Sequence, residues 1–168
     1  FIKGFIQPKY DNASLPVFTY ESKMTISQGN EEIELYNFGK AHTDGDSAVV
    51  FKNNNIIHTG DAFVRYGYPY VDLNNGGSIK GLINFLGTLE LLCNDNTIII
   101  PGHGGLSKKE DVTNLKNTLD DLYTKTIIGL KNGLSYREIS DSIDETLNGD
   151  TIVKLNYIKS IELELSRN

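Results

Sequence analysis

Alternating apolar and polar residues in the first third of the chain predict short β-strands. Between residues 31 and 38, Ile33 and Leu35 alternate with Glu32 and Glu34, as in a strand with one buried face. Turn-forming residues at 28–30 and 52–55 divide these stretches into two hairpins. Residues 1–16 lack clear periodicity and are expected to form an irregular lead-in. The predicted strands are Val17–Tyr20, Met24–Ser27, Glu31–Phe38, Ser47–Phe51 and Ile56–Thr59.

In the second half of the chain, apolar residues recur every three or four positions and predict helices. The first opens at Gly76-Gly77-Ser78 and runs to about Cys93. Capping boxes are expected at Ser107/Glu110, for a helix to about Leu130, and at Ser135/Glu138 for a short one; Asp150 can cap the last helix. The expected buried positions are Ile79, Leu82, Ile83, Leu86, Leu89 and Leu92 in the first helix, and Leu155, Ile158, Ile161 and Leu165 in the last.

Two further segments, at residues 97–100 and 63–75, predict a buried strand and a long loop. The continuous apolar stretch Thr97–Ile100 predicts a strand covered on both faces. Residues 63–75 are rich in Tyr and Gly and predict a long loop, a kind of segment that is often functional. The order of strands, loop, helix, strand and helices predicts an α/β (α+β) layer arrangement, with residues 1–168 forming a single domain.

Composition and charge exclude several partners. The net charge of −6 provides no basic surface for nucleic acid or for anionic lipid, and no apolar run approaches membrane-spanning length. The single cysteine, Cys93, rules out a disulfide within the chain and is expected in the core.

The chain's three histidines fall in three short segments that each end an apolar run: 41–46 (AHTDGD), 58–61 (HTGD) and 101–104 (PGHG). Two of these segments follow predicted strands, so their side chains can converge on one rim of a sheet. Histidine nitrogen and aspartate oxygen suit zinc and similar divalent metals, which makes His42, Asp61 and His103 the candidate ligands.

Each of these residues also has a plainer interpretation. His42 and His103 can be ordinary loop histidines, and Asp61 can be a turn aspartate that bonds its own backbone. However, a carboxylate directly after a buried strand is costly unless it is paired or bound to metal. Glycines on both sides of His103 would let the backbone pass close to a bound ion.

Residues 39 to about 106 resemble the carboxy-terminal half of the metallo-β-lactamase superfamily. The resemblance rests on GKAHTDGDS at 39–47, IHTGD at 57–61 and PGHG at 101–104, in that order, with YPYVD at 68–72 and GGS at 76–78 between them. It implies part of an αββα sandwich, with a mixed sheet and outer helices.

The resemblance also implies a hydrolase whose expected partner is a small-molecule substrate. His42 would bind a first metal, His103 a second, and Asp61 would bridge the two and be the catalytic candidate. A metal-bound hydroxide would attack an ester, thioester or amide-type bond, because metal binding lowers the pKa of water from 15.7 to about 7. Two zinc ions are expected in a complete site, and the ligand types would also suit iron or manganese.

The sequence departs from this family at its first motif, His-x-His-x-Asp-His, of which it has no trace; no histidine precedes His42. Since the chain also begins at Phe1, we expect an amino-terminally truncated domain that holds half the ligands, binds metal weakly and is inactive alone. A non-catalytic fragment or binding module that retains the fold is the alternative. The sheet face left bare should be apolar and should promote self-association.

Several neighbouring residues are secondary candidates. His58 is expected to pack or to orient a ligand, because strand alternation places it on the opposite face from Asp61. Asp46 and Asp44 are expected either to steady the His42 loop or to be solvated. A helix-start anion site at 76–78 is possible, but a plain cap is preferred. The residues that could meet substrate, or pack as an aromatic loop edge, are Arg65, Tyr66, Tyr68 and Tyr70.

Overall fold

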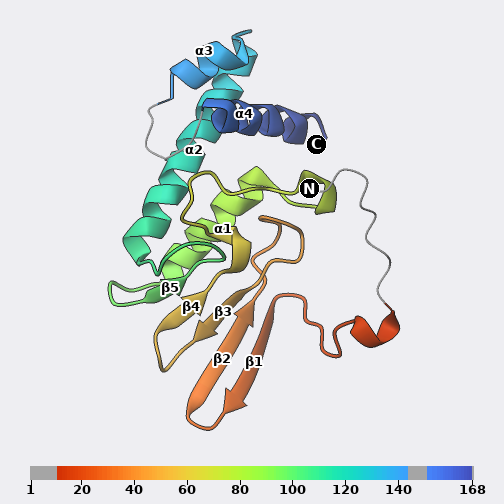
Figure 1. Ribbon diagram of the computed structural model, residues 1–168, viewed down its shortest axis with the longest axis vertical. Helices are drawn as coiled ribbons and strands as arrows, with labels where there is room; N and C mark the ends of the chain where they lie inside the picture. The colour runs from red at the N-terminus through yellow and green to blue at the C-terminus, as the bar shows by residue number, and fades with distance from the viewer. Residues whose placement is uncertain (1–10, 144–150, 168) are drawn as a thin grey trace.

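The computed structural model describes residues 11–143 and 151–167 and has a mixed five-stranded sheet with helices packed on one face (Figure 1). The strands lie in chain order, the first four antiparallel and the last parallel to its neighbour. The fold class predicted from sequence is therefore confirmed. The strands are β1 (Lys23–Gln28), β2 (Glu31–Tyr36), β3 (Ala48–Phe51), β4 (Ile56–His58) and β5 (Ile98–Ile100).

The remaining described elements are four α-helices and three short 3₁₀ turns. Both predicted hairpins form, but 17–20 is not a strand, and Val17 and Phe18 are exposed. The α-helices are α1 (Ile79–Leu92), α2 (Lys109–Lys131), α3 (Tyr136–Asp141) and α4 (Thr151–Ser166); the 3₁₀ turns are η1 (Asn12–Ser14), η2 (Gly60–Ala62) and η3 (Leu73–Asn75).

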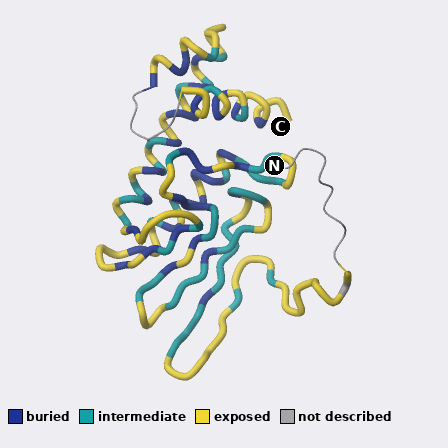
Figure 2. The backbone as a smooth tube through the Cα atoms, viewed as in Figure 1, coloured by how far each residue is buried: buried dark blue, intermediate teal, exposed yellow. Residues whose placement is uncertain are grey.

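The core lies between α1 and one face of the sheet. Ala48, Ile57 and Ile99 are buried there from three adjacent strands, and the ring of Phe38 contacts that of Phe85 on α1 edge to face. Burial is concentrated where the helices meet the sheet, whereas the tip of the β1–β2 hairpin is exposed (Figure 2). Cys93 is buried as predicted, and burial raises the pKa of its thiol to about 11.

The opposite face of the sheet is apolar and only partly covered. The strand register places Phe51, Ile56 and Ile98 side by side on this face, and Ile98 is 42% exposed while Ile99 on the helix face is fully buried. The prediction that 97–100 is covered on both faces is therefore wrong. The same face continues through Ile26 and Ile33 to the β1 edge.

Two predicted helix details require correction. Helix α2 is capped at Lys108, whose N–H donates to Asp111, because Ser107 instead pairs with the backbone of Ile99. Leu92 is 40% exposed at the end of α1, where the helix leaves the core. The Ser135/Glu138 capping box and the Ser78 cap form as predicted.

Helix α4 is rotated relative to its predicted inner face. Ile158 and Ile161 are buried as expected, but Leu165 is exposed and the chain instead buries Tyr157 and Glu164. The predicted cap at Asp150 lies outside the described residues. Among the helices that the structure describes, none has the length and apolar character needed to cross a bilayer.

Candidate metal centre

The three candidate ligands come from three different loops at one end of the sheet. His42 lies between β2 and β3, Asp61 in the η2 turn directly after β4, and His103 just after β5. Strands β4 and β5 are parallel neighbours, so the segments that leave them start side by side. A parallel bridge between Val64 and His103 continues this pairing past Asp61. The topology thus brings together residues that are far apart in the sequence.

The carboxylate of Asp61 lies between the two imidazoles. Oδ1 is 3.4 Å from Nε2 of His103, and Oδ2 is 3.9 Å from Nε2 of His42. Both distances exceed the roughly 2.7–3.2 Å of an ordinary hydrogen bond, so each oxygen faces a different ring without bonding it directly. The His42, Asp61 and His103 side chains are 20%, 38% and 60% exposed, so the cluster opens to solvent.

His42 is oriented by the loop that follows η2. Its Nδ1 is 2.7 Å from the carbonyl oxygen of Tyr70, an acceptor that fixes the proton on Nδ1 and leaves Nε2 as the free lone pair facing Asp61. The His42 carbonyl accepts from the N–H of Asp72 at 2.8 Å, and the ring of Tyr70 stands edge-on to the imidazole. Sequence reasoning missed this contact, since a backbone carbonyl has no sequence signal.

Glycines are required beside the cluster because backbone and side chains approach closely there. A Cβ on Gly102 would lie 2.1 Å from Oδ1 of Asp61, and one on Gly77 would lie 2.4 Å from the His42 carbonyl. Gly104 has a φ of +103°. The glycines around His103 thus make room for the Asp61 carboxylate and for the turn, rather than for an ion alone.

The neighbouring polar residues mainly support the loops. Asp46 accepts from the N–H of Thr43 at 2.7 Å and so holds the His42 loop, while Asp44 is exposed. His58 is exposed and accepts from the N–H of Gly60 at 3.1 Å, so it does not pack in the core. Hydrogen bonds from Asn75, first from its side-chain amide, hold the pKa of Asp72 below its usual 3.8.

The four residues named as possible substrate contacts divide into distinct environments. Tyr66 and Tyr70 are about half exposed, and their rings lie 5.8 Å from those of His103 and His42 respectively. The Arg65 side chain is ion-paired with Asp111, and the backbone N–H of Arg65 donates to the His103 carbonyl. Tyr68 is buried against Tyr157 of α4 and does not face the cluster.

The start of α1 is occupied by an anion from the chain itself. One Glu164 oxygen accepts from the Ser78 hydroxyl at 2.6 Å, and the other accepts from the Ile79 N–H at 2.8 Å. The site at 76–78 is therefore a helix cap made by Ser78, as preferred from the sequence, and the Glu164 carboxylate from α4 adds to it, which no sequence pattern predicted.

The cluster has three potential ligand residues, two histidines and the Asp61 carboxylate between them. Across residues 11–143 and 151–167, no group of three or more His, Cys, Asp or Glu side chains is arranged to hold one metal ion. Each histidine instead has one oxygen of Asp61 beside it. The donor types fit zinc, but each ion would have only two of the three or four protein ligands that a settled site uses.

Solved structures of low sequence identity share this fold. The stereoselective inverting sec-alkylsulfatase from a Pseudomonas species matches 88% of this chain and 26% of that chain, with a TM-score of 0.66 and 12% identity. A metallo-β-lactamase from Pontibacter korlensis matches 66% of this chain and 52% of that chain, with a TM-score of 0.56 and 17% identity. The chain thus spans about a quarter and about half of their lengths. No family model matches the sequence, and no curated protein is similar enough to match it.

Proposed function

Starting from a metallo-β-lactamase-type fold, we propose that this chain carries part of the binuclear metal centre of a metal-dependent hydrolase. The observation that carries the proposal is the Asp61 carboxylate, which has one oxygen near Nε2 of His42 and the other near Nε2 of His103. A bridging carboxylate and one imidazole for each ion are the donors that a pair of zinc ions would need from this segment.

In this proposal, His42 would hold one ion, His103 would hold the other, and Asp61 would be shared between them. Each ion would then have two donors from the described residues, and one or two further ligands would be needed to complete a settled site. Zinc is the preferred metal, while iron or manganese would accept the same donors. The ions would supply a water that is deprotonated near neutral pH and would polarise the bond to be cleaved.

The chain's own residues position these donors. The Tyr70 carbonyl holds the proton of His42 on Nδ1, so Nε2 is free to bind metal without a change of tautomer. Asp46 fixes the loop that carries His42. Tyr66 and Tyr70 are half-exposed beside the two histidines and are the residues best placed to contact a substrate with an ester, thioester or amide-type bond.

Isothermal titration with zinc, together with hydrolysis assays on an ester and a β-lactam, tests the proposal. We expect weak zinc binding by this chain and no turnover, with binding lost in Asp61→Asn and His103→Gln and retained in His58→Gln. Zinc binding that is indifferent to Asp61→Asn would contradict the metal centre. It would favour the alternative of a non-catalytic binding module that has kept only the fold.

A further inference from the structure

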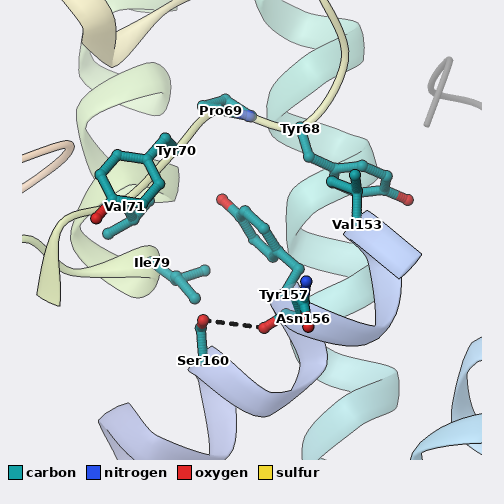
Figure 3. A pocket seen from close by; sticks show the side chains of 9 residues that line it. All are labelled: Tyr68, Pro69, Tyr70, Val71, Ile79, Val153, Asn156, Tyr157 and Ser160. Carbon is teal, nitrogen blue, oxygen red and sulfur yellow. Dashed lines mark hydrogen bonds between the residues drawn. The ribbon is translucent and has the colours of Figure 1, made fainter. Parts of the chain in front are cut away.

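A pocket of about 300 Å³ lies between the loop at residues 68–71 and helix α4 (Figure 3). Pro69 and Val71 line it from the loop, Ile79 from the start of α1, and Val153 from α4. None of its lining residues carries a charge. A concave, mostly apolar site of this size can hold a compact organic group but offers nothing to neutralise an ionic one.

One polar group in this pocket is buried without a partner. Tyr157 is 7% exposed, and within the described part of the chain its hydroxyl has no hydrogen-bond partner. Its ring projects from α4 toward the loop at residues 68–71 (Figure 3). A buried hydroxyl without a partner is costly, so its retention calls for an explanation. Burial raises the pKa of this phenol above its usual 10, so the group stays protonated and can donate.

The pocket and the proposed metal centre share Tyr70. This residue lines the pocket, while its carbonyl accepts from His42 and its ring contacts the His42 imidazole. A molecule in the pocket would therefore contact one side of Tyr70, while His42 contacts the other. The pocket is thus separated from His42 of the proposed metal centre by Tyr70.

We propose that this pocket binds an uncharged, compact apolar group that carries one hydrogen-bond-acceptor oxygen, which accepts from the Tyr157 hydroxyl. This inference rests on the proposed function: the bound group is the part of the substrate adjacent to the bond that is cleaved. The apolar walls select its shape, and the unpartnered Tyr157 hydroxyl favours a carbonyl or ether oxygen over a hydrocarbon of the same size.

Cyclohexanone and methylenecyclohexane provide matched probes, since they share a shape and differ in the acceptor oxygen. Binding to the 168-residue chain is measured by titration of backbone amide NMR signals. We expect cyclohexanone to shift the amide signals of Tyr68, Tyr70 and Val71 and those of residues 153–160. Tyr157→Phe should weaken the binding of cyclohexanone by about fivefold, the effect of one neutral hydrogen bond, and should leave the binding of methylenecyclohexane unchanged.

Two controls make the result decisive. Tyr136→Phe removes a hydroxyl that already donates to Glu162 at an exposed site, and it should alter neither probe. Asp61→Asn should leave cyclohexanone binding intact, so a failure of the metal centre is seen separately from a failure of the pocket. The inference is overturned if neither probe shifts these amides, or if Tyr157→Phe has the same effect on both probes.

Discussion

At the residue scale, Gly102 determines whether Asp61 can stand between the two histidines. Its N–H donates to the Gly60 carbonyl at 2.9 Å, and a methyl group at this position would collide with Oδ1 of Asp61. Gly102→Ala should therefore displace the carboxylate and weaken zinc binding by about 10- to 100-fold, the range seen when residues that support a metal ligand are lost. Isothermal titration with zinc measures the change.

Gly105→Ala is the matched control for this substitution. Gly105 lies three residues further along the same loop, and a Cβ there would meet nothing within 4 Å. Its zinc affinity should stay close to that of the parent chain. Equal losses in both variants would indicate that the loop is sensitive to any side chain, and the specific role of Gly102 would then be wrong.

The sequence predicts the positions of some site residues better than those of others. The convergence of Asp61 and His103 follows from their positions after the neighbouring strands β4 and β5 and could be predicted, whereas His42 lies in the loop between β2 and β3. The acceptor for His42 is a backbone carbonyl, and the clash at Gly102 arises between loops about 40 residues apart, so neither has a local pattern. The roles of these residues in metal binding stay predictions.

At the element scale, the β1–β2 hairpin contains a carboxylate that ties its stability to pH. Glu34 accepts from Lys23 at 2.6 Å and from the Tyr36 hydroxyl, and these bonds, the one from Lys23 first, lower its pKa from 4.5 to about 2. Since the folded pKa is the lower one, the stabilisation is complete above about pH 4.5 and is lost as the pH falls toward 2.

The test compares Glu34→Gln with the parent chain by urea unfolding across this pH range. The variant should have the lower free energy of unfolding at pH 7, and the difference should disappear near pH 2. Glu21→Gln, at an exposed position just before β1, should show no such difference. A Glu34→Gln deficit that is constant from pH 7 to pH 2 would contradict the ion-pair explanation.

Helix α4 is held to the start of α1 by Glu164. Its carboxylate accepts from the Ser78 hydroxyl and the Ile79 N–H at a buried position, where it also complements the helix dipole. Glu164→Ala should lower the free energy of unfolding by about 2–3 kcal/mol, because buried donors lose a charged acceptor. Glu162→Ala, at an exposed site on α4, should cost less than about 1 kcal/mol. Similar losses in the two variants would rule out this role.

Glu164 also explains why the sequence misplaced the face of α4. Counting apolar residues at helical spacing selects Leu165, whereas the structure turns Glu164 inward to satisfy N–H groups on another helix. Where the apolar face of a helix contacts only apolar neighbours, as for most of α1, the same counting predicts the buried residues correctly. Periodicity detects burial among apolar residues and does not detect a buried acceptor.

At the scale of the whole molecule, the partly bare sheet face is the feature with the largest physical consequence. Ile26 and Ile98 are 43% and 42% exposed at its two edges, with Ile33, Phe51 and Ile56 between them. We expect two copies of the chain to associate through this face at high concentration, because contiguous apolar surface favours its own burial.

Light scattering over a concentration series checks this expectation. The apparent mass should rise with concentration, and Ile98→Lys should suppress the rise by placing a charge on the face. Leu91→Lys, at an 85% exposed position on α1, is the control and should not suppress it. A monodisperse monomer at every concentration would refute the expectation.

The central claim is that His42 and His103, but not His58, bind metal through Nε2. The most direct measurement is long-range ¹H–¹⁵N NMR of the histidine ring nitrogens during titration with zinc. We predict that Nε2 of His42 and His103 moves to the metal-bound chemical shift, that Nδ1 of His42 stays protonated against Tyr70, and that His58 is unaffected. If zinc leaves both rings unchanged, or shifts His58 equally, there is no metal centre at this cluster.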